Sequence, residues 1–302
     1  MLTGKIIKGI GGFYYVAVDP KNAEGGETKE IIYETRARGL FRMEGLRPLV
    51  GDDCEIAVTD AEKHTGNIEK ILPRRSMLIR PAVANTDQAI VIFAVSKPEP
   101  HTGLMDRYLV QMEVYEVPVI LVLNKIDQDE EAGKALAEIY RKAGFTVVLT
   151  SAKTGVGMSE LKRLMKGKTS VLSGPSGVGK SSIINALFPG VRMETGEISK
   201  KIGRGKHTTR HSELMVAGDD TFLFDTPGFS SVELPEKLDE ESLPLYFPEF
   251  QPYLGKCKFS TCRHLSEPDC RVKEALAEGK IEKSRYENYA GMMDELAKRR
   301  KY

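Results

Sequence analysis

A glycine-rich motif in the middle of the chain constrains the fold more than any other feature of the sequence. Residues 174–181 read Gly-Pro-Ser-Gly-Val-Gly-Lys-Ser and match the pattern G-x-x-x-x-G-K-[ST] at every defined position. An apolar run, 168–173, precedes the motif, and a helix-forming run, 182–187, follows it. A strand, a glycine loop and a helix in this order predict a phosphate-binding α/β domain. The alternative, an ordinary glycine-rich turn, would not require that context.

The polar residues that end the loop have distinct expected roles. The glycines allow backbone N–H groups to turn toward a phosphate without obstruction by side chains. Lys180 is expected to contact the β- and γ-phosphates of a nucleotide, and the Ser181 hydroxyl is expected to bind Mg²⁺.

Two further motifs indicate which base the nucleotide carries. Asn124-Lys125-Ile126-Asp127 follows the apolar run 119–123, and Ser151-Ala152-Lys153 follows the apolar run 145–149. The Asp127 carboxylate can accept from both N1–H and the N2 amine of guanine, whereas adenine has no donor at N1. The Lys125 stem can lie across the base, and the Ser151–Lys153 backbone can donate to the guanine O6. Each motif is weak alone, but together they favour guanine.

A fourth motif, Asp225-Thr226-Pro227-Gly228, follows the apolar run 221–224 and predicts the γ-phosphate end of the site. Asp225 is expected to hold Mg²⁺ through water, and the Gly228 N–H is expected to contact the γ-phosphate. Phe229 stands where many GTPases have a glutamine that orients the attacking water.

Because phenylalanine cannot orient water, another residue must take over the role of this glutamine. The candidates lie in the polar segment 203–210, between the phosphate loop and Asp225. Thr208 and Thr209 both qualify as the Mg²⁺ ligand of a first switch loop, and the sequence does not decide between them. His207 is the candidate for positioning or activating water. A solvated loop histidine is the alternative.

The order of these motifs is unusual, because the base-reading motifs precede the phosphate loop. In an ordinary small GTPase the phosphate loop opens the domain and the base-reading motifs close it. The sequence therefore predicts a circularly permuted GTPase core.

A cysteine-rich cluster near the C-terminus predicts a metal site. Its four residues lie within a stretch of 14, in the spacing C-x4-C-x-H-x5-C: Cys257, Cys262, His264 and Cys270. Three thiolates and an imidazole form a tetrahedral zinc set with no open position, so we expect one structural Zn²⁺ per chain. Disulfide bonding is the alternative, but three clustered cysteines cannot all pair with one another. The remaining cysteine, Cys54, is expected to be a buried core residue.

The first 72 residues predict a small β-barrel, because five short β-rich runs are separated by Gly-rich turns. An OB-fold and an SH3-like barrel fit this pattern equally well. Their net charge is −2, against +4 for residues 73–231 and −1 for residues 232–302, so any RNA contact must come from local patches. Arg36, Arg38 and Arg42 are candidates, since alternate spacing places them on one strand face.

The chain resembles the bacterial ribosome small-subunit-dependent GTPases in four features taken together. These are the permuted motif order, the Gly-x-Gly-x-His-Thr-Thr loop, the Asp-Thr-Pro-Gly motif with an apolar residue after it, and the Cys/Cys/His/Cys cluster. The resemblance covers essentially the whole chain. It implies an OB-fold over residues 1–72, a permuted GTPase core over 73–231 and a mostly α zinc-binding domain over 232–302.

The resemblance also implies a late assembly factor of the small ribosomal subunit that binds its rRNA and hydrolyses GTP to GDP when the subunit stimulates it. By position it implies a catalytic His207 and zinc at the Cys/His cluster. It further implies nucleotide contacts at residues 124–127 and at the following set: Ser173, Gly174, Pro175, Ser176, Gly177, Val178, Gly179, Lys180 and Ser181.

Other function classes remain open at this point. A P-loop kinase or ATPase would lack the base-reading motifs, and a GTP-gated RNA-binding scaffold without hydrolysis is suggested by Phe229. The longest apolar runs are about seven residues, and a membrane helix needs ~20. With no recognisable targeting sequence at Met1–Lys5, we expect a cytoplasmic monomer.

Overall fold

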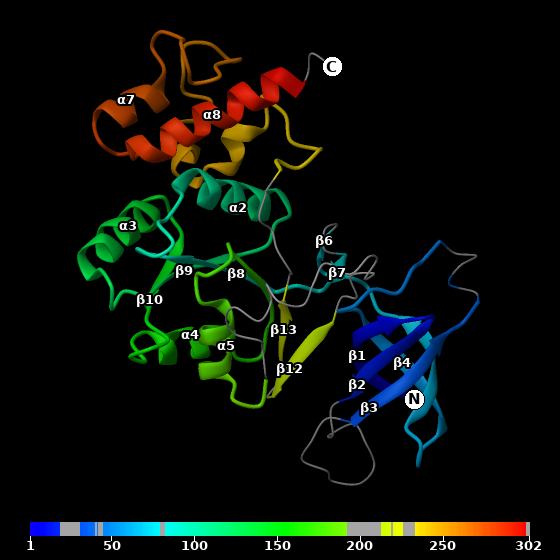
Figure 1. The fold of residues 1–302 in the computed structure, drawn as a ribbon. Coiled ribbons are helices and arrows are strands. Elements are labelled where there is room, and N and C mark those ends of the chain that lie inside the picture. The colour runs from blue at the N-terminus through cyan, green and yellow to red at the C-terminus, as the bar shows by residue number, and fades with distance from the viewer. Residues whose placement is uncertain are drawn as a thin grey trace. The chain divides into compact units, whose positions relative to one another are not determined.

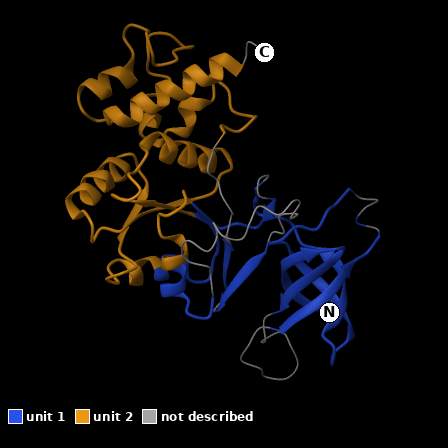
Figure 2. Ribbon diagram, in the orientation of Figure 1, with its two compact units in different colours: residues 1–89, 162–173, 184–227 blue, residues 90–161, 174–183, 228–302 orange. Residues whose placement is uncertain are grey.

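The structure is a computed structural model that describes residues 1–18, 31–39, 41, 45–78, 82–191, 213–218, 220–225 and 233–299 (Figure 1). The chain divides into two compact units that alternate along the sequence (Figure 2). One unit comprises residues 1–89, 162–173 and 184–227, and the other comprises residues 90–161, 174–183 and 228–302.

The N-terminal strands form a closed five-stranded barrel in the order β1-β2-β3-β5-β4. Its strands are β1 (Leu2–Ile10), β2 (Phe13–Val18), β3 (Ile31–Ala37), β4 (Asp53–Asp60) and β5 (Thr65–Ile71). All neighbouring strands are antiparallel except β3 and β5, which are parallel. This order fits the five-stranded Greek-key barrel of the OB-fold. The barrel that the sequence predicted is therefore confirmed.

Inward-facing apolar side chains fill the barrel, because alternate residues of each strand point to one face. Ile6, Val16, Ile56 and Ile68 are completely buried. Cys54 lies in the same core, as expected. Its burial raises the pKa of the thiol to about 12, so it is an inert packing residue.

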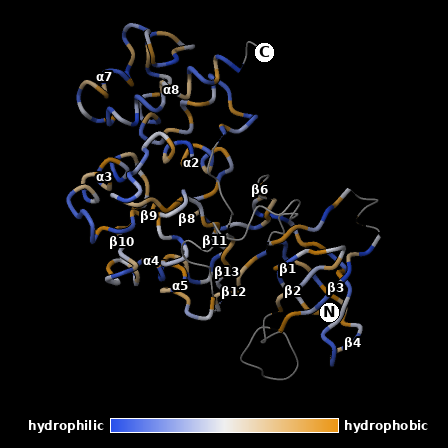
Figure 3. The backbone as a smooth tube through the Cα atoms, viewed as in Figure 1, coloured by the Kyte–Doolittle hydropathy of each residue, from blue (hydrophilic) through white to orange (hydrophobic). Residues whose placement is uncertain are grey.

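A six-stranded sheet, in the order β10-β9-β8-β11-β13-β12, forms the α/β core. Its strands are β8 (Gln88–Ala94), β9 (Val119–Asn124), β10 (Thr146–Thr150), β11 (Thr169–Ser173), β12 (Leu214–Gly218) and β13 (Thr221–Asp225). All seven residues of β8 are buried, and β8 and β9 consist mainly of apolar residues (Figure 3). Such runs are typical of parallel strands covered on both faces. A separate hairpin joins β6 (Met77–Leu78) and β7 (Val83–Ala84).

The helices of the core are α2 (Thr102–Val114), α3 (Glu130–Lys142), α4 (Met158–Met165) and α5 (Lys180–Leu187). The His101 ring caps α2 by accepting from the Leu104 N–H, and the Asp129 carboxylate caps α3 by accepting from the Ala132 N–H. Helix α3 also has acidic residues in its first turn and basic residues in its last, which suits the helix dipole.

The C-terminal region contains two 3₁₀ helices, η2 (Leu243–Tyr246) and η3 (Pro248–Tyr253), and two α-helices, α7 (Arg271–Ala277) and α8 (Lys283–Arg299). The two α-helices agree with the mostly α domain that the resemblance implies for this region, and a stretch with Pro244, Pro248 and Pro252 precedes them. Phe247, Phe250 and Tyr289 pack with Val110 and Val114 of α2 in one buried cluster. No helix among the described residues is long and apolar enough to cross a membrane.

Candidate functional site

The phosphate loop lies between β11 and α5, as the sequence predicted. Gly174 has φ +139°, and a Cβ at this position would lie 2.1 Å from the Ile92 carbonyl oxygen, so only glycine fits. The Lys180 ammonium folds over the loop and donates to the carbonyl oxygens of Gly174 (2.7 Å) and Pro175 (2.8 Å). Lys180 is thereby placed where phosphate oxygens would bind. Ser181 follows it in the first turn of α5 and is partly exposed, as a Mg²⁺ ligand must be.

The side chain of Asn124 joins the base-reading motifs to the phosphate loop. This residue ends β9 and is buried. Its amide nitrogen donates to the Val178 carbonyl (2.9 Å), and its amide oxygen accepts from the Thr150 hydroxyl (3.2 Å). A Cβ on Gly179 would lie 2.4 Å from the Asn124 nitrogen, which explains the glycine there. Asn124 therefore sets the distance between the two ends of the predicted site.

Lys125 crosses from the end of β9 to the phosphate loop. Its backbone has φ +66°, an uncommon conformation for a residue with a side chain. Its ammonium donates to the carbonyl oxygens of Gly177 (2.6 Å) and Lys97 (2.5 Å). The aliphatic part of the Lys125 side chain is thus fixed between two loops, and a base can stack against it. The Lys97 carbonyl was not foreseen, because any residue type supplies one.

Asp127 is exposed and oriented by Ser151. The Ser151 hydroxyl donates to Asp127 Oδ1 (2.6 Å) and accepts from the Thr154 N–H (3.2 Å). The Ala152 N–H points toward the Asn124 amide oxygen at 3.4 Å, and Lys153 is exposed beside it. Ile126 is held by a hydrogen bond from its N–H to the Thr150 carbonyl (3.2 Å). The structure therefore brings both predicted base-reading motifs together with the phosphate loop in one compact unit.

Several predicted residues of the γ-phosphate end lie outside the described residues: His207, Thr208, Thr209 and Gly228. The backbone of Asp225 is described, and it ends β13 opposite Leu172 of β11. The strand that carries Asp225 is therefore paired with the strand that leads into the phosphate loop.

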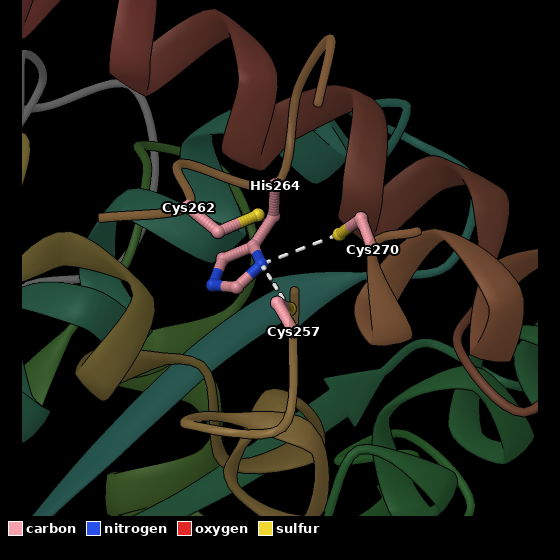
Figure 4. Close-up of side chains that lie close together, drawn as sticks. All are labelled: Cys257, Cys262, His264 and Cys270. Atoms are coloured by element: carbon pink, nitrogen blue, oxygen red, sulfur yellow. Dashed lines mark hydrogen bonds between the residues drawn. The ribbon is translucent and has the colours of Figure 1, made fainter. Parts of the chain in front are cut away.

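The four residues of the predicted zinc site converge (Figure 4). Their ligand atoms all lie within 4.8 Å of one another. In a tetrahedral site with Zn–S near 2.3 Å and Zn–N near 2.0 Å, sulfur and nitrogen lie about 3.5 Å apart. His264 Nδ1 lies 3.6 Å from the sulfur of Cys257 and 3.4 Å from that of Cys270. The donor set and its spacing fit Zn²⁺.

The surroundings of the cluster also suit a cation. Burial raises the pKa of the Cys262 thiol to about 12 and lowers the pKa of His264, which keeps the imidazole neutral. Neutral imidazole is the form that binds zinc, and a cation would offset the cost of the thiolates. Two tyrosines of α8 hold the backbone around His264 in place. Tyr286 donates to the His264 carbonyl and Tyr289 donates to the Arg263 carbonyl, each at 2.7 Å.

On the barrel, Arg36 and Arg38 are both exposed at alternate positions, at and just after the end of β3, and Arg42 lies outside the described residues. Arg36 stacks on the Phe13 ring, with its guanidinium carbon 4.6 Å from the ring centroid. Arg38 forms an ion pair with Glu69 (2.6 Å). Strand β3 ends at Ala37, so Arg36 lies in the strand and Arg38 lies beyond it, and the predicted common strand face is not confirmed. The role of these arginines in RNA binding stays a prediction.

Comparison with known families identifies the chain. The RsgA GTPase model matches residues 71–235, and the RsgA N-terminal domain model matches residues 3–68. The chain belongs to the RsgA GTPase family. A protein from Agathobacter rectalis named small ribosomal subunit biogenesis GTPase RsgA is 53% identical, and one of the same name from Alkaliphilus metalliredigens is 47% identical. Each alignment covers 100% of both chains.

Solved structures of RsgA-like proteins agree. The crystal structure of YjeQ from Thermotoga maritima is 37% identical with a TM-score of 0.82, and the alignment covers 98% of each chain. The crystal structure of YloQ, described as a circularly permuted GTPase, is 36% identical with a TM-score of 0.79 and covers 99% of this chain and 96% of YloQ. These relationships confirm the permuted core and the enzyme class, a GTPase, that the sequence predicted. They also exclude the kinase class.

Proposed function

We propose that this chain hydrolyses GTP to GDP and phosphate as a late assembly factor of the small ribosomal subunit. In this proposal the subunit stimulates hydrolysis, and the bound nucleotide controls association with the subunit and release from it. The observation that carries the proposal is the Asn124 side chain, which links the base-reading motifs directly to the phosphate loop. The names of the two relatives, which cover the whole chain, support the assignment to the small subunit.

The guanine base binds against Lys125 and is recognised by Asp127. The second carboxylate oxygen, Oδ2, remains available to the base while Ser151 donates to Oδ1. The Ser151–Lys153 turn provides backbone N–H groups for the guanine O6. Guanine is thereby preferred over adenine, which would leave the carboxylate without a donor at N1.

The phosphates bind the loop from Ser173 to Ser181, where Lys180 moves from the loop carbonyls onto the β- and γ-phosphates. Mg²⁺ is held by Ser181, Asp225 and one of Thr208 or Thr209. When bound, Mg²⁺ neutralises charge on the β- and γ-phosphate oxygens. His207 positions the attacking water in place of the glutamine that many GTPases use, and the Gly228 N–H contacts the γ-phosphate.

The remaining parts of the chain hold the enzyme on its partner. We assign residues 1–72 to an OB-fold that contacts rRNA through Arg36, Arg38 and Arg42, residues 73–231 to the GTPase, and residues 232–302 to the zinc-binding domain. The zinc has a structural role, since four protein ligands leave no position for a substrate. The protein acts as a monomer in the cytoplasm.

Phosphate release tests this function. Purified protein is incubated with GTP or ATP, with and without small ribosomal subunits, and a Lys180→Ala variant serves as the control for contaminating hydrolases. We expect GTP hydrolysis that rises when subunits are added and no hydrolysis of ATP. Equal rates with and without subunits, or equal use of ATP, would refute the proposal.

A further inference from the structure

A buried ionic network joins helix α8 of the C-terminal region to helix α2 of the nucleotide-binding core. The Arg285 side chain is 1% exposed, and those of Asp106 and Glu249 are 0% and 4% exposed. Arg285 donates through Nη1 to Asp106 Oδ1 (2.6 Å), and through Nε and Nη2 to the two Glu249 oxygens (2.7 and 3.0 Å). Three ionised groups out of water are costly unless their hydrogen-bond geometry is good, so the network constrains the elements that carry them.

Both oxygens of the Asp106 carboxylate accept hydrogen bonds, and the donors come from helices α3 and α8. Tyr140 of α3 donates to Oδ1 (2.9 Å), and Asn288 of α8 donates to Oδ2 (2.7 Å). The rings of Phe247, Phe145 and Tyr140 surround the Arg285 guanidinium, with centroids 4.8–5.6 Å from its carbon. Such a buried, hydrogen-bonded and ring-packed network restricts the position of α2 against α8.

Asn288 also touches the first turn of α2. A Cβ on Gly103 would lie 3.3 Å from the Asn288 amide oxygen and 3.2 Å from the His101 ring. His101 caps the helix, so α8 braces α2 at the residue where the preceding loop enters it. Helices α8 and α2 lie side by side (Figure 1).

The loop that enters α2 carries the carbonyl that orients Lys125. Its first residue, Val95, is fixed by an N–H bond to the Asn124 carbonyl (3.0 Å), and its last residue is the cap, His101. Between these two anchored ends, the Lys97 carbonyl accepts the Lys125 ammonium. The position of the Lys97 carbonyl therefore depends on where α2 begins.

We propose that Arg285 and Asn288 are positioning residues for the guanine site. They fix Asp106 and the first turn of α2, which places the Lys97 carbonyl and, through it, the Lys125 stem against the base. These two residues of α8 thus affect the affinity for the nucleotide without contacting it. This inference rests on the proposed guanine site.

The test measures the dissociation constant of a fluorescent GDP analogue, together with zinc content and melting temperature, for variants of the full-length protein. Arg285→Lys keeps the charge but cannot contact both carboxylates in the same way, and Asn288→Ala removes a partly exposed side chain. Lys142→Met is the matched control, since it removes the ion pair between Lys142 of α3 and Glu282 (2.5 Å) and leaves α2 unchanged.

We expect Arg285→Lys and Asn288→Ala to weaken GDP binding about fivefold to tenfold, the size typical of residues that act through others. The zinc content should stay at that of the unaltered protein, and Lys142→Met should bind GDP within about twofold of it. In a Lys125→Met background, Arg285→Lys should cause no further loss of affinity, because the side chain that it positions is gone.

Two results would overturn the inference alone: unchanged GDP affinity in both α8 variants, or an equal loss with and without Lys125, which indicates a general structural effect. If Lys125→Met itself binds GDP as tightly as the unaltered protein, the proposed guanine site is wrong, and the positioning role falls with it. If Arg285→Lys misfolds, its zinc content will fall. In that case the GDP affinity of Asn288→Ala tests the inference.

Discussion

Exchange of Asp127 for asparagine should change the base preference of the site, and the structure gives the direction. Ser151 accepts from the Thr154 N–H and donates to Asp127 Oδ1, so an asparagine keeps this arrangement by turning its oxygen to Ser151. Its NH₂ group then faces the base. Guanine presents N1–H and N2–H donors there, so two donors meet, whereas xanthine presents an acceptor.

The size of the effect follows from the bonds lost. A hydrogen bond to a charged group contributes about 1.5–3 kcal/mol, and the unmatched donors add to that loss. We expect Asp127→Asn to weaken GDP binding by about 3 kcal/mol, or about 150-fold. Xanthosine diphosphate should bind the variant more tightly than GDP does.

Competition titrations of a fluorescent GDP analogue with GDP, xanthosine diphosphate and ADP give these affinities. Ser151→Ala is the matched control, because it removes the orienting hydroxyl but keeps the carboxylate, and it should weaken GDP binding only a few-fold. Retention of GDP affinity within about threefold in Asp127→Asn would show that this carboxylate does not read the base.

Three further predictions concern the phosphates, the metal and catalysis. Lys180→Ala or Ser181→Ala should abolish GTP turnover, and full phosphate release by either would place the site elsewhere. Elemental analysis should find about one zinc per chain, and Cys262→Ser should lose it and lower the melting temperature, whereas a fully folded, zinc-free protein contradicts the site. His207→Ala should keep nucleotide and subunit binding in titration and co-sedimentation but lose most of the stimulated rate. Unchanged stimulation would assign catalysis to another group.

The sequence predicted the strands and motifs of the nucleotide site because each motif follows a continuous apolar run. Such runs become buried parallel strands, and the residues that end β9, β10 and β11 consequently meet at one edge of the sheet. The zinc ligands were equally predictable, because three cysteines and a histidine in 14 residues have few other uses.

The contacts that hold these parts in place could not be predicted. Arg285 and Asp106 are 179 residues apart, and on sequence alone nothing distinguishes them from the other charged residues of the chain. The Lys97 carbonyl has no side-chain signature, and the positive φ of Lys125 (+66°) is uncommon for a lysine. These features arise from tertiary packing, which a pattern of residue types does not encode.

The central claim is that the guanine nucleotide bound here sets the affinity of the protein for the small ribosomal subunit. Co-sedimentation of the purified protein with small subunits, in a non-hydrolysable GTP analogue and in GDP, measures this most directly. By linkage, subunits must tighten binding of the GTP analogue by the same factor that the analogue tightens binding to subunits. We predict clearly tighter subunit binding with the GTP analogue than with GDP, and equal affinity in the two nucleotide states would contradict the claim.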